Sequence, residues 1–126
     1  YPTDARKHLW PGLREVYPQA SRQPESAEVI KRLLHVQALE TARCMEEGVV
    51  TTAAEADLGS VLGWGFPAWT GGTLSYVDAV GIREFVAECD RMSKRYGKRF
   101  KPSRWLRARA ERNEPFHPSA AAAASG

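Results

Sequence analysis

Apolar residues recur at intervals of three and four along most of this chain, and a glycine or a proline closes each such stretch. Between 26 and 47 one helical face is traced by Ile30, Leu33, Leu34, Ala38, Thr41, Ala42 and Met45. Gly48 follows directly and favours a C-terminal stop. No stretch alternates in the way that indicates a strand. The spacing therefore predicts an all-α fold, a single compact bundle of five to six helices.

The remaining helices are predicted from their start and stop signals. Thr52-Ala53-Ala54-Glu55 is a capping box, so a helix should begin at Ala53 and end at Gly63. A short helix is expected over Leu74–Val80, capped by Thr73. Helical spacing continues from Ile82 to Tyr96, and a last helix should open at Pro102 and run towards Glu111.

We expect three parts in the 126 residues: a short helix and linker over 1–24, a helical domain over 25–112, and an irregular, alanine-rich tail over 113–126. Mean hydropathy is −0.45, and the longest apolar run, Ala120–Ala124, is far too short to cross a bilayer. The N-terminus shows no signal-peptide pattern, so we expect a protein that is not secreted.

Positive charge gathers near the C-terminus. Between Arg91 and Arg112 lie ten basic residues and one acid, Glu111. The simplest interpretation is a solvated face whose arginine stems cover apolar surface. The alternative is an anion-facing surface that holds an acidic partner or coenzyme A phosphates. Its candidate residues are Arg95, Lys98, Arg99 and Arg104. No nucleic-acid-binding module surrounds them, and we expect no nucleic-acid partner.

The residues that usually carry chemistry form no recognisable site. Cys44 and Cys89 lie in predicted helices and are expected to be buried, free thiols. His8, His35 and His117 lack the spacing of a zinc site, and His35 is expected to be a half-buried structural residue. The residues alone therefore predict no catalytic, cofactor-binding or metal-ligating group in this chain.

One stretch matches a cofactor motif by coincidence. Gly63-Trp64-Gly65-Phe66-Pro67-Ala68 satisfies Gly-x-Gly-x-x-Ala, but a helix precedes it where the dinucleotide motif needs a strand. Pro67 also removes an amide donor. We interpret Trp64, Phe66 and Trp69 instead as an aromatic corner between two helices that packs in the core.

Four motifs, in order and spacing, carry a family resemblance. They are Leu39-Glu40-Thr41-Ala42-Arg43-Cys44, Ala54-Glu55-Ala56-Asp57, Gly65-Phe66-Pro67, and Gly71-Gly72-Thr73-Leu74-Ser75-Tyr76-Val77-Asp78. Together they closely resemble the C-terminal helical domain of 3-hydroxyacyl-CoA dehydrogenases. The resemblance is closest to the second, last copy of that domain in the alpha subunit of the fatty acid beta-oxidation multienzyme complex, and it covers about Glu25 to Glu111.

The resemblance implies a place in a multifunctional enzyme of lipid metabolism. Its other domains hydrate enoyl-CoA and oxidise (S)-3-hydroxyacyl-CoA with NAD, an oxidoreductase reaction whose histidine and glutamate lie in a Rossmann domain. NAD is thus a cofactor of the full-length enzyme, and this chain has none of its own. Bacterial relatives are cytoplasmic, and eukaryotic ones are mitochondrial or peroxisomal, which sets the expected location.

Two departures from the family pattern affect the expected role. The first copy of the domain supplies a substrate-contacting asparagine in an Asn-Arg pair, which here aligns with Lys31-Arg32. A lysine has donors only and cannot replace an amide, which implies a non-catalytic copy. Close relatives also have arginine where this chain has Thr70.

The resemblance implies that such a copy docks on the first helical domain and the Rossmann domain of the parent chain, and it leaves open contact with a thiolase subunit. In isolation it would then be able to self-associate. The residues expected in the core or at this interface are Ile30, Leu33, Leu34, Trp64, Phe66, Trp69 and Tyr76.

Overall fold

The computed structural model describes residues 6–118, and in this range every regular element is a helix. The α-helices are α1 (Leu13–Val16), α2 (Ser26–Glu46), α3 (Ala53–Trp64), α4 (Thr73–Val80), α5 (Ile82–Tyr96) and α6 (Arg104–Glu111). Two 3₁₀ turns, η1 (Ala68–Thr70) and η2 (Lys98–Phe100), lie in the connections. The all-α prediction is confirmed.

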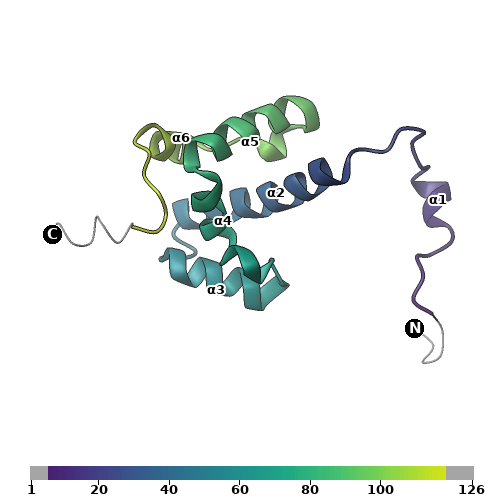
Figure 1. Ribbon diagram of the computed structural model, residues 1–126, viewed down its shortest axis with the longest axis horizontal. Helices are drawn as coiled ribbons and strands as arrows, with labels where there is room; N and C mark the ends of the chain where they lie inside the picture. The colour runs from purple at the N-terminus through teal and green to yellow at the C-terminus, as the bar shows by residue number, and fades with distance from the viewer. Residues whose placement is uncertain (1–5, 119–126) are drawn as a thin grey trace.

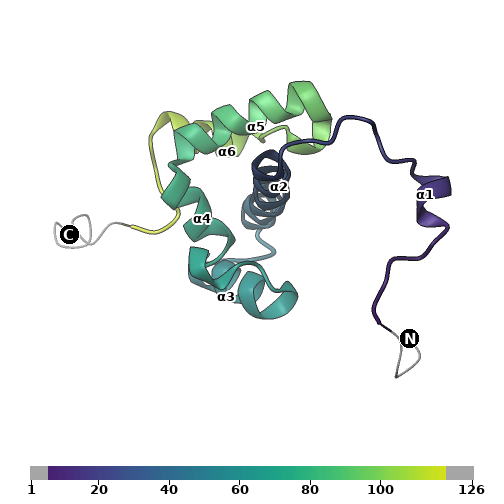
Figure 2. The ribbon, with the colours of Figure 1, turned by 45° about the vertical axis from the view of Figure 1, so that its right-hand side comes forward.

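Helix α2 is the centre of the bundle. Figure 2 looks nearly along it, with α5 and α6 on one side, α3 on the other and α4 linking the two sides. Helix α2 packs against α3, α4 and α5, and α6 packs against α5. The core side chains are Ala38, Leu39, Ala42, Ala56, Leu74, Val77, Ile82, Phe85, Val86, Cys89, Leu106, Ala110 and Phe116. Helix α1 lies apart from this body on an extended tether (Figure 1).

The buried face of α2 is rotated relative to the predicted one. Ile30 and Leu33 are each 56% exposed, whereas Leu34, His35, Ala38 and Leu39 are buried. Ile30 and Leu33 are therefore not in the core of the described residues, and their expected place at a domain interface stays a prediction. Helix α5 packs on the side of α2 that carries His35, whose ring stacks on Phe85. Ile30 and Leu33 lie on a different side of α2 and stay exposed.

Three helix boundaries differ slightly from the prediction. Helix α3 runs through Gly63 to Trp64 and is capped by Gly65, whose φ of 75° lies in the left-handed region. Helix α4 begins at Thr73, so this residue is not its N-cap. Helix α6 begins at Arg104, where the Ser103 hydroxyl accepts from the Leu106 amide. Gly63 does not end α3, because a single glycine inside a helix is tolerated at a modest cost in stability.

The segment after α6 joins the body. Phe116 is buried and packs near Trp105, with ring centroids 6.1 Å apart. We expected residues 113–126 to form an irregular tail, and the part up to Pro118 has no regular structure but contributes to the core. The alanine run lies outside the described residues.

Candidate functional site

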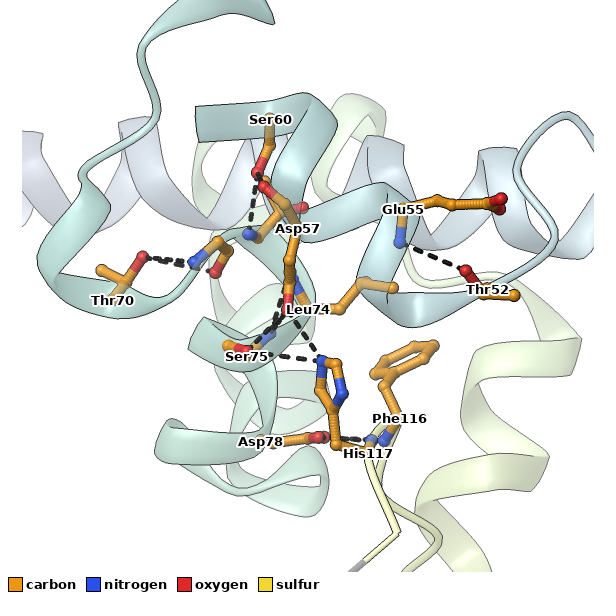
Figure 3. A network of polar contacts seen from close by, with 12 residues as sticks. Thr52, Glu55, Asp57, Ser60, Thr70, Leu74, Ser75, Asp78, Phe116 and His117 are labelled. Atoms are coloured by element: carbon orange, nitrogen blue, oxygen red, sulfur yellow. Dashed lines mark hydrogen bonds and ion pairs between the residues drawn. The ribbon is translucent and has the colours of Figure 1, made fainter. Parts of the chain in front are cut away.

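A buried carboxylate organises the densest polar network of the described residues (Figure 3). Asp57, on α3, is 5% exposed and accepts from the Leu74 amide at 2.7 Å. It also accepts from the amide and the hydroxyl of Ser75, the latter at 2.6 Å. The negative charge thus lies at the N-terminus of α4, where it satisfies amides that the helix itself leaves unpaired. Asp57 caps α4 in place of the predicted Thr73.

A second carboxylate extends this network to the C-terminal segment. Asp78, on α4, accepts from the amides of Phe116 and His117, each at 2.8 Å. The His117 ring then reaches back, with Nε2 2.7 Å from Asp57 Oδ2. We call Asp57, Ser75, Asp78 and His117 the Asp57 clasp. The clasp joins α3, α4 and the chain end, which lie far apart in sequence.

The clasp contains serine, histidine and aspartate, yet its geometry is not that of a hydrolase triad. The Ser75 hydroxyl and Asp57 approach the same ring nitrogen, His117 Nε2, at 3.4 and 2.7 Å. A catalytic histidine uses one nitrogen for the nucleophile and the other for the carboxylate. Here the Ser75 hydroxyl donates to Asp57 instead. The arrangement is structural and leaves no activated nucleophile.

The glycine-rich corner after α3 does not fit a dinucleotide. It follows a helix, and the Phe66 amide donates back to the Ser60 carbonyl at 3.0 Å and is not available to a phosphate. Thr70 closes the next turn, because its hydroxyl donates to the Pro67 carbonyl at 2.7 Å and accepts from the Gly72 amide at 3.1 Å. The corner is a helix connection.

The aromatic residues of that corner have three different environments. Phe66 is buried, 2% exposed, and its ring lies 6.2 Å from that of half-buried Tyr76. Trp64 and Trp69 are 56% and 80% exposed, so the expectation that both pack in the core is wrong. The Trp64 indole donates to Gln37 Oε1 at 3.0 Å. Two large apolar rings therefore stand at the surface next to a well-packed core.

Lys31 takes part in an ion-pair network between α2 and α5. Its ammonium lies 3.4 Å from Glu88 Oε1, and Arg91 contacts both Glu88, at 2.6 Å, and Glu28, at 3.0 Å. Hydrogen bonds from Tyr96 and then Arg91 lower the pKa of Glu28, and the bond from Arg91 lowers the pKa of Glu88. The network fixes Lys31 beside an acid of its own chain.

The basic segment divides into paired and unpaired residues. Arg91 and Arg107 pair with acids of α2 and α5, and Arg109 and Arg112 pair with Glu114. Six exposed residues have no ion pair within 6–118: Lys94, Arg95, Lys98, Arg99, Lys101 and Arg104. All four candidate anion-facing residues belong to this exposed set. They surround the end of α5, η2 and the start of α6.

The two cysteines differ in burial. Cys89 is fully buried in the core, and burial raises the pKa of its thiol to about 12. Cys44 is free and half-buried, so the prediction that both thiols are buried is correct only for Cys89.

A thiol-reactive probe at pH 8 should therefore modify Cys44 in the folded chain and leave Cys89 unmodified, because the thiolate is the reacting species. Quantifying the released chromophore of Ellman's reagent should give one thiol per folded chain and two after denaturation. Two rapidly reacting thiols under native conditions would contradict this assignment.

His35 is a buried core residue, 2% exposed, and not half-buried as predicted. Its Nδ1 lies 3.0 Å from the Lys31 carbonyl oxygen, so this nitrogen carries the proton and donates. The ring stacks on Phe85 with centroids 4.8 Å apart, and Nε2 has no hydrogen-bond partner. Burial lowers the pKa of His35 because the charged imidazolium is disfavoured there.

The lowered pKa makes stability depend on pH below 6.5. The unfolded chain takes up a proton at His35 before the folded chain does, so stability is lost as pH falls below the unfolded pKa. Urea titrations between pH 7.5 and 5.5 should show a loss approaching about 1.4 kcal/mol per pH unit from this one group. His35→Gln, which cannot take up a proton, should flatten the profile, and an unchanged profile would refute the role of His35.

No group of three or more His, Cys, Asp or Glu residues in the described range could hold a metal ion. None of the helices in that range is both long and apolar enough to span a membrane. An apolar groove of about 560 Å³ lies between α2 and α3. We call it the α2–α3 groove, and its lining includes Thr41, Cys44, Val50, Ala56, Gly59 and Gly63.

Comparison with known proteins identifies relatives of this helical body. No protein-family model matches the chain. The chain is 42% identical over 101 residues to the fatty acid oxidation complex subunit alpha of Pseudomonas syringae pathovar tomato. It is 38% identical over 96 residues to that of Acinetobacter baumannii, and 39% over 95 residues to that of Pseudomonas paraeruginosa. These matches cover 75–80% of the chain and 13–14% of each relative, so the chain spans about a seventh of their length.

Proposed function

Because the chain is a homologue of one segment of the fatty acid oxidation complex subunit alpha, we propose that it is a helical module of a fatty acid beta-oxidation enzyme. In the full-length protein, neighbouring domains would oxidise (S)-3-hydroxyacyl-CoA with NAD. This module would be non-catalytic and would dock against the Rossmann domain and the first helical domain, with a thiolase subunit as a further partner. The homology confirms the family resemblance of the sequence.

The ion pair of Lys31 carries the non-catalytic assignment. The family resemblance aligns Lys31 with a substrate-contacting asparagine, and here its ammonium is held 3.4 Å from Glu88, whose carboxylate is also bound by Arg91. A lysine has donors only, so it cannot accept a hydrogen bond from a substrate hydroxyl as an asparagine amide can. The Asp57 clasp, the glycine-rich corner and Cys89 supply no substitute chemistry, since each is engaged or buried within the fold.

Exposed apolar side chains support the docking role. Trp64 and Trp69 flank the corner after α3, Leu58 and Leu62 are 62% and 75% exposed on α3, and Ile30 is exposed on α2. Large apolar residues concentrated on neighbouring elements are typical of a surface that a partner covers.

An activity assay tests the proposal. The purified chain should produce no NADH from NAD and (S)-3-hydroxybutyryl-CoA, and Lys31→Asn should not create activity, because the hydride acceptor site lies elsewhere in the parent enzyme. Turnover that co-purifies with the chain and disappears on replacement of Lys31 would overturn the non-catalytic assignment.

The exposed basic residues favour a second candidate function, the binding of coenzyme A phosphates or an acidic partner. Arg95, Lys98, Arg99 and Arg104 have no carboxylate partner in the described range and project from adjacent turns. Calorimetric titration with coenzyme A should release heat that falls with added salt. A titration without heat at millimolar coenzyme A would count against coenzyme A as the ligand. The double variant Arg99→Glu with Arg104→Glu would then be tested for weaker binding to an acidic protein partner.

A further inference from the structure

Helix α2 carries a second apolar stripe, on a side that the bundle covers only in part. Val29, Leu33 and Val36 follow one another at intervals of four and three residues, so they share one side of the helix. Leu33 is 56% exposed, and the two valines are half-buried. The buried side of α2 carries different residues, among them Leu34 and Ala38. The core of the bundle therefore does not account for this second stripe.

The 3₁₀ turn η2 forms a wall beside the stripe. A depression of about 190 Å³ lies between the two, and its lining consists of Val29, Arg32, Leu33, Val36, Arg99 and Phe100. We call it the α2–η2 depression. Phe100 is only 3% exposed, so it belongs to the base of the depression and not to its rim. The lining combines aliphatic and aromatic groups with two arginines, and it contains no acid.

The walls of the α2–η2 depression are held in place by contacts within the chain. Arg43 of α2 donates to the carbonyl oxygens of Arg99 and Lys101, at 3.4 and 3.1 Å, and so ties η2 to α2. The Arg32 guanidinium lies over the Tyr96 ring, 3.9 Å from its centre. A preformed site loses less conformational entropy when a ligand binds. The depression thus has its shape before any partner arrives.

Positive charge at the depression has no partner in the part of the chain that the structure describes. Arg99 lines the depression, Lys98 begins η2, and Lys101 follows it. None of the three forms an ion pair within 6–118. Glu28 and Glu40 of α2 are already paired with arginines, so they do not neutralise these cations. An apolar surface edged by unpaired cations is complementary to an apolar, acidic partner.

The shape of the surface favours a polypeptide over a lipid bilayer or coenzyme A. Insertion into a bilayer needs apolar side chains that protrude, whereas Leu33 lines a concave depression. A phosphate group would contact the cations and leave the apolar stripe uncovered. An amphipathic helix covers both, because its own apolar residues recur at the intervals that separate Val29, Leu33 and Val36.

We propose that the α2–η2 depression binds an acidic amphipathic helix of a partner polypeptide. The apolar side of that helix packs over Leu33 and the neighbouring valines, and its carboxylates pair with Lys98, Arg99 and Lys101. The inference rests on the second candidate function proposed above, and it specifies the form of the acidic partner.

Fluorescence anisotropy with a synthetic helical probe tests the proposal. The probe carries leucines at intervals of four and three between glutamates, and a comparison peptide has the same composition in scrambled order. The 126-residue chain should bind the probe about tenfold more tightly than the scrambled peptide. Arg99→Glu or Leu33→Asp should each weaken probe binding by about tenfold or more. Arg14→Glu and Val49→Asp, which change exposed residues outside the depression, are the matched controls and should leave it unchanged.

Two further titrations distinguish this inference from the function on which it rests. Heat with coenzyme A but no binding of the probe at about 100 μM would refute the helical partner and leave the second candidate function in place. Binding to phosphatidylglycerol vesicles but not to the probe would refute it in favour of a membrane. Equal binding of both peptides, or probe binding that Arg99→Glu and Leu33→Asp leave unchanged, would also overturn the proposal. Circular dichroism verifies that each variant is folded.

Discussion

Asp57→Ala should lower the free energy of unfolding by about 3–5 kcal/mol. The substitution leaves the amides of Leu74 and Ser75 at the start of α4 without their acceptor, removes the partner of the Ser75 hydroxyl, and detaches His117. Because the Leu74 amide is buried, water cannot replace the lost acceptor without opening the junction of α3 and α4. Urea-induced unfolding followed by circular dichroism measures the loss.

Two further variants separate the clasp from a general effect of charge. Ser75→Ala removes one hydroxyl and should cost about 1 kcal/mol. Glu46→Ala removes an exposed acid and should change stability by less than about 0.5 kcal/mol. If Asp57→Ala costs no more than Ser75→Ala, the carboxylate is not the centre of the network.

Gly72→Ala should be at least as damaging, with a loss of about 3 kcal/mol or more. Gly72 has a φ of 124°, and a Cβ at this position would lie closer than 3.0 Å to the backbone and side chain of Asp57. The added methyl group must therefore push α4 away from the residue that caps it. Thermal and urea unfolding both measure this loss.

The matched substitution is Gly63→Ala in the last turn of α3. A Cβ there meets nothing within 4 Å, and alanine favours a helix over glycine, so stability should rise by about 0.5–1 kcal/mol. Equal losses at Gly72 and Gly63 would show that helix propensity, and not the contact with Asp57, decides the outcome.

The fold was largely predictable from the spacing of apolar residues. The capping box at Thr52 is confirmed at its first half, because the Thr52 hydroxyl accepts from the Glu55 amide at 3.2 Å. The Glu55 carboxylate also accepts from the Thr51 hydroxyl at 3.0 Å, and hydrogen bonds from Thr51 and from Thr52 lower its pKa. Spacing identifies that a helix starts, and competition among neighbouring donors decides the exact bonds.

The polar network was not predictable, because its members come from three distant parts of the sequence. Asp57 lies in a helical pattern where an aspartate is expected to face solvent, and nothing near it signals a partner at His117. The only local sign is Gly71-Gly72, since paired glycines before a helix indicate a turn and give no hint of a buried partner. The glycine at 72 is in fact required by the close approach of Asp57.

The orientation of apolar residues at the surface was also beyond a pattern-based prediction. Ile30 and Leu34 both fit helical spacing, and only the crossing of α4 and α5 over α2 determines that Leu34 is buried and Ile30 is exposed. Trp64 and Trp69 alternate with glycines and Pro67 between two helices, a pattern that favours an aromatic corner packed in the core. Their exposure is what the proposed docking role accounts for.

The central claim, that this chain is a docking module without catalytic groups, is tested most directly by adding it to a fatty acid oxidation complex subunit alpha that lacks the homologous segment. The Pseudomonas syringae alpha subunit, truncated at that segment, would be mixed with the chain, and binding would be measured by calorimetry together with NADH production. The account predicts a one-to-one complex with increased dehydrogenase activity, abolished by Trp64→Asp with Trp69→Asp. Absence of binding, or activity that depends on Lys31 of the added chain, would contradict it.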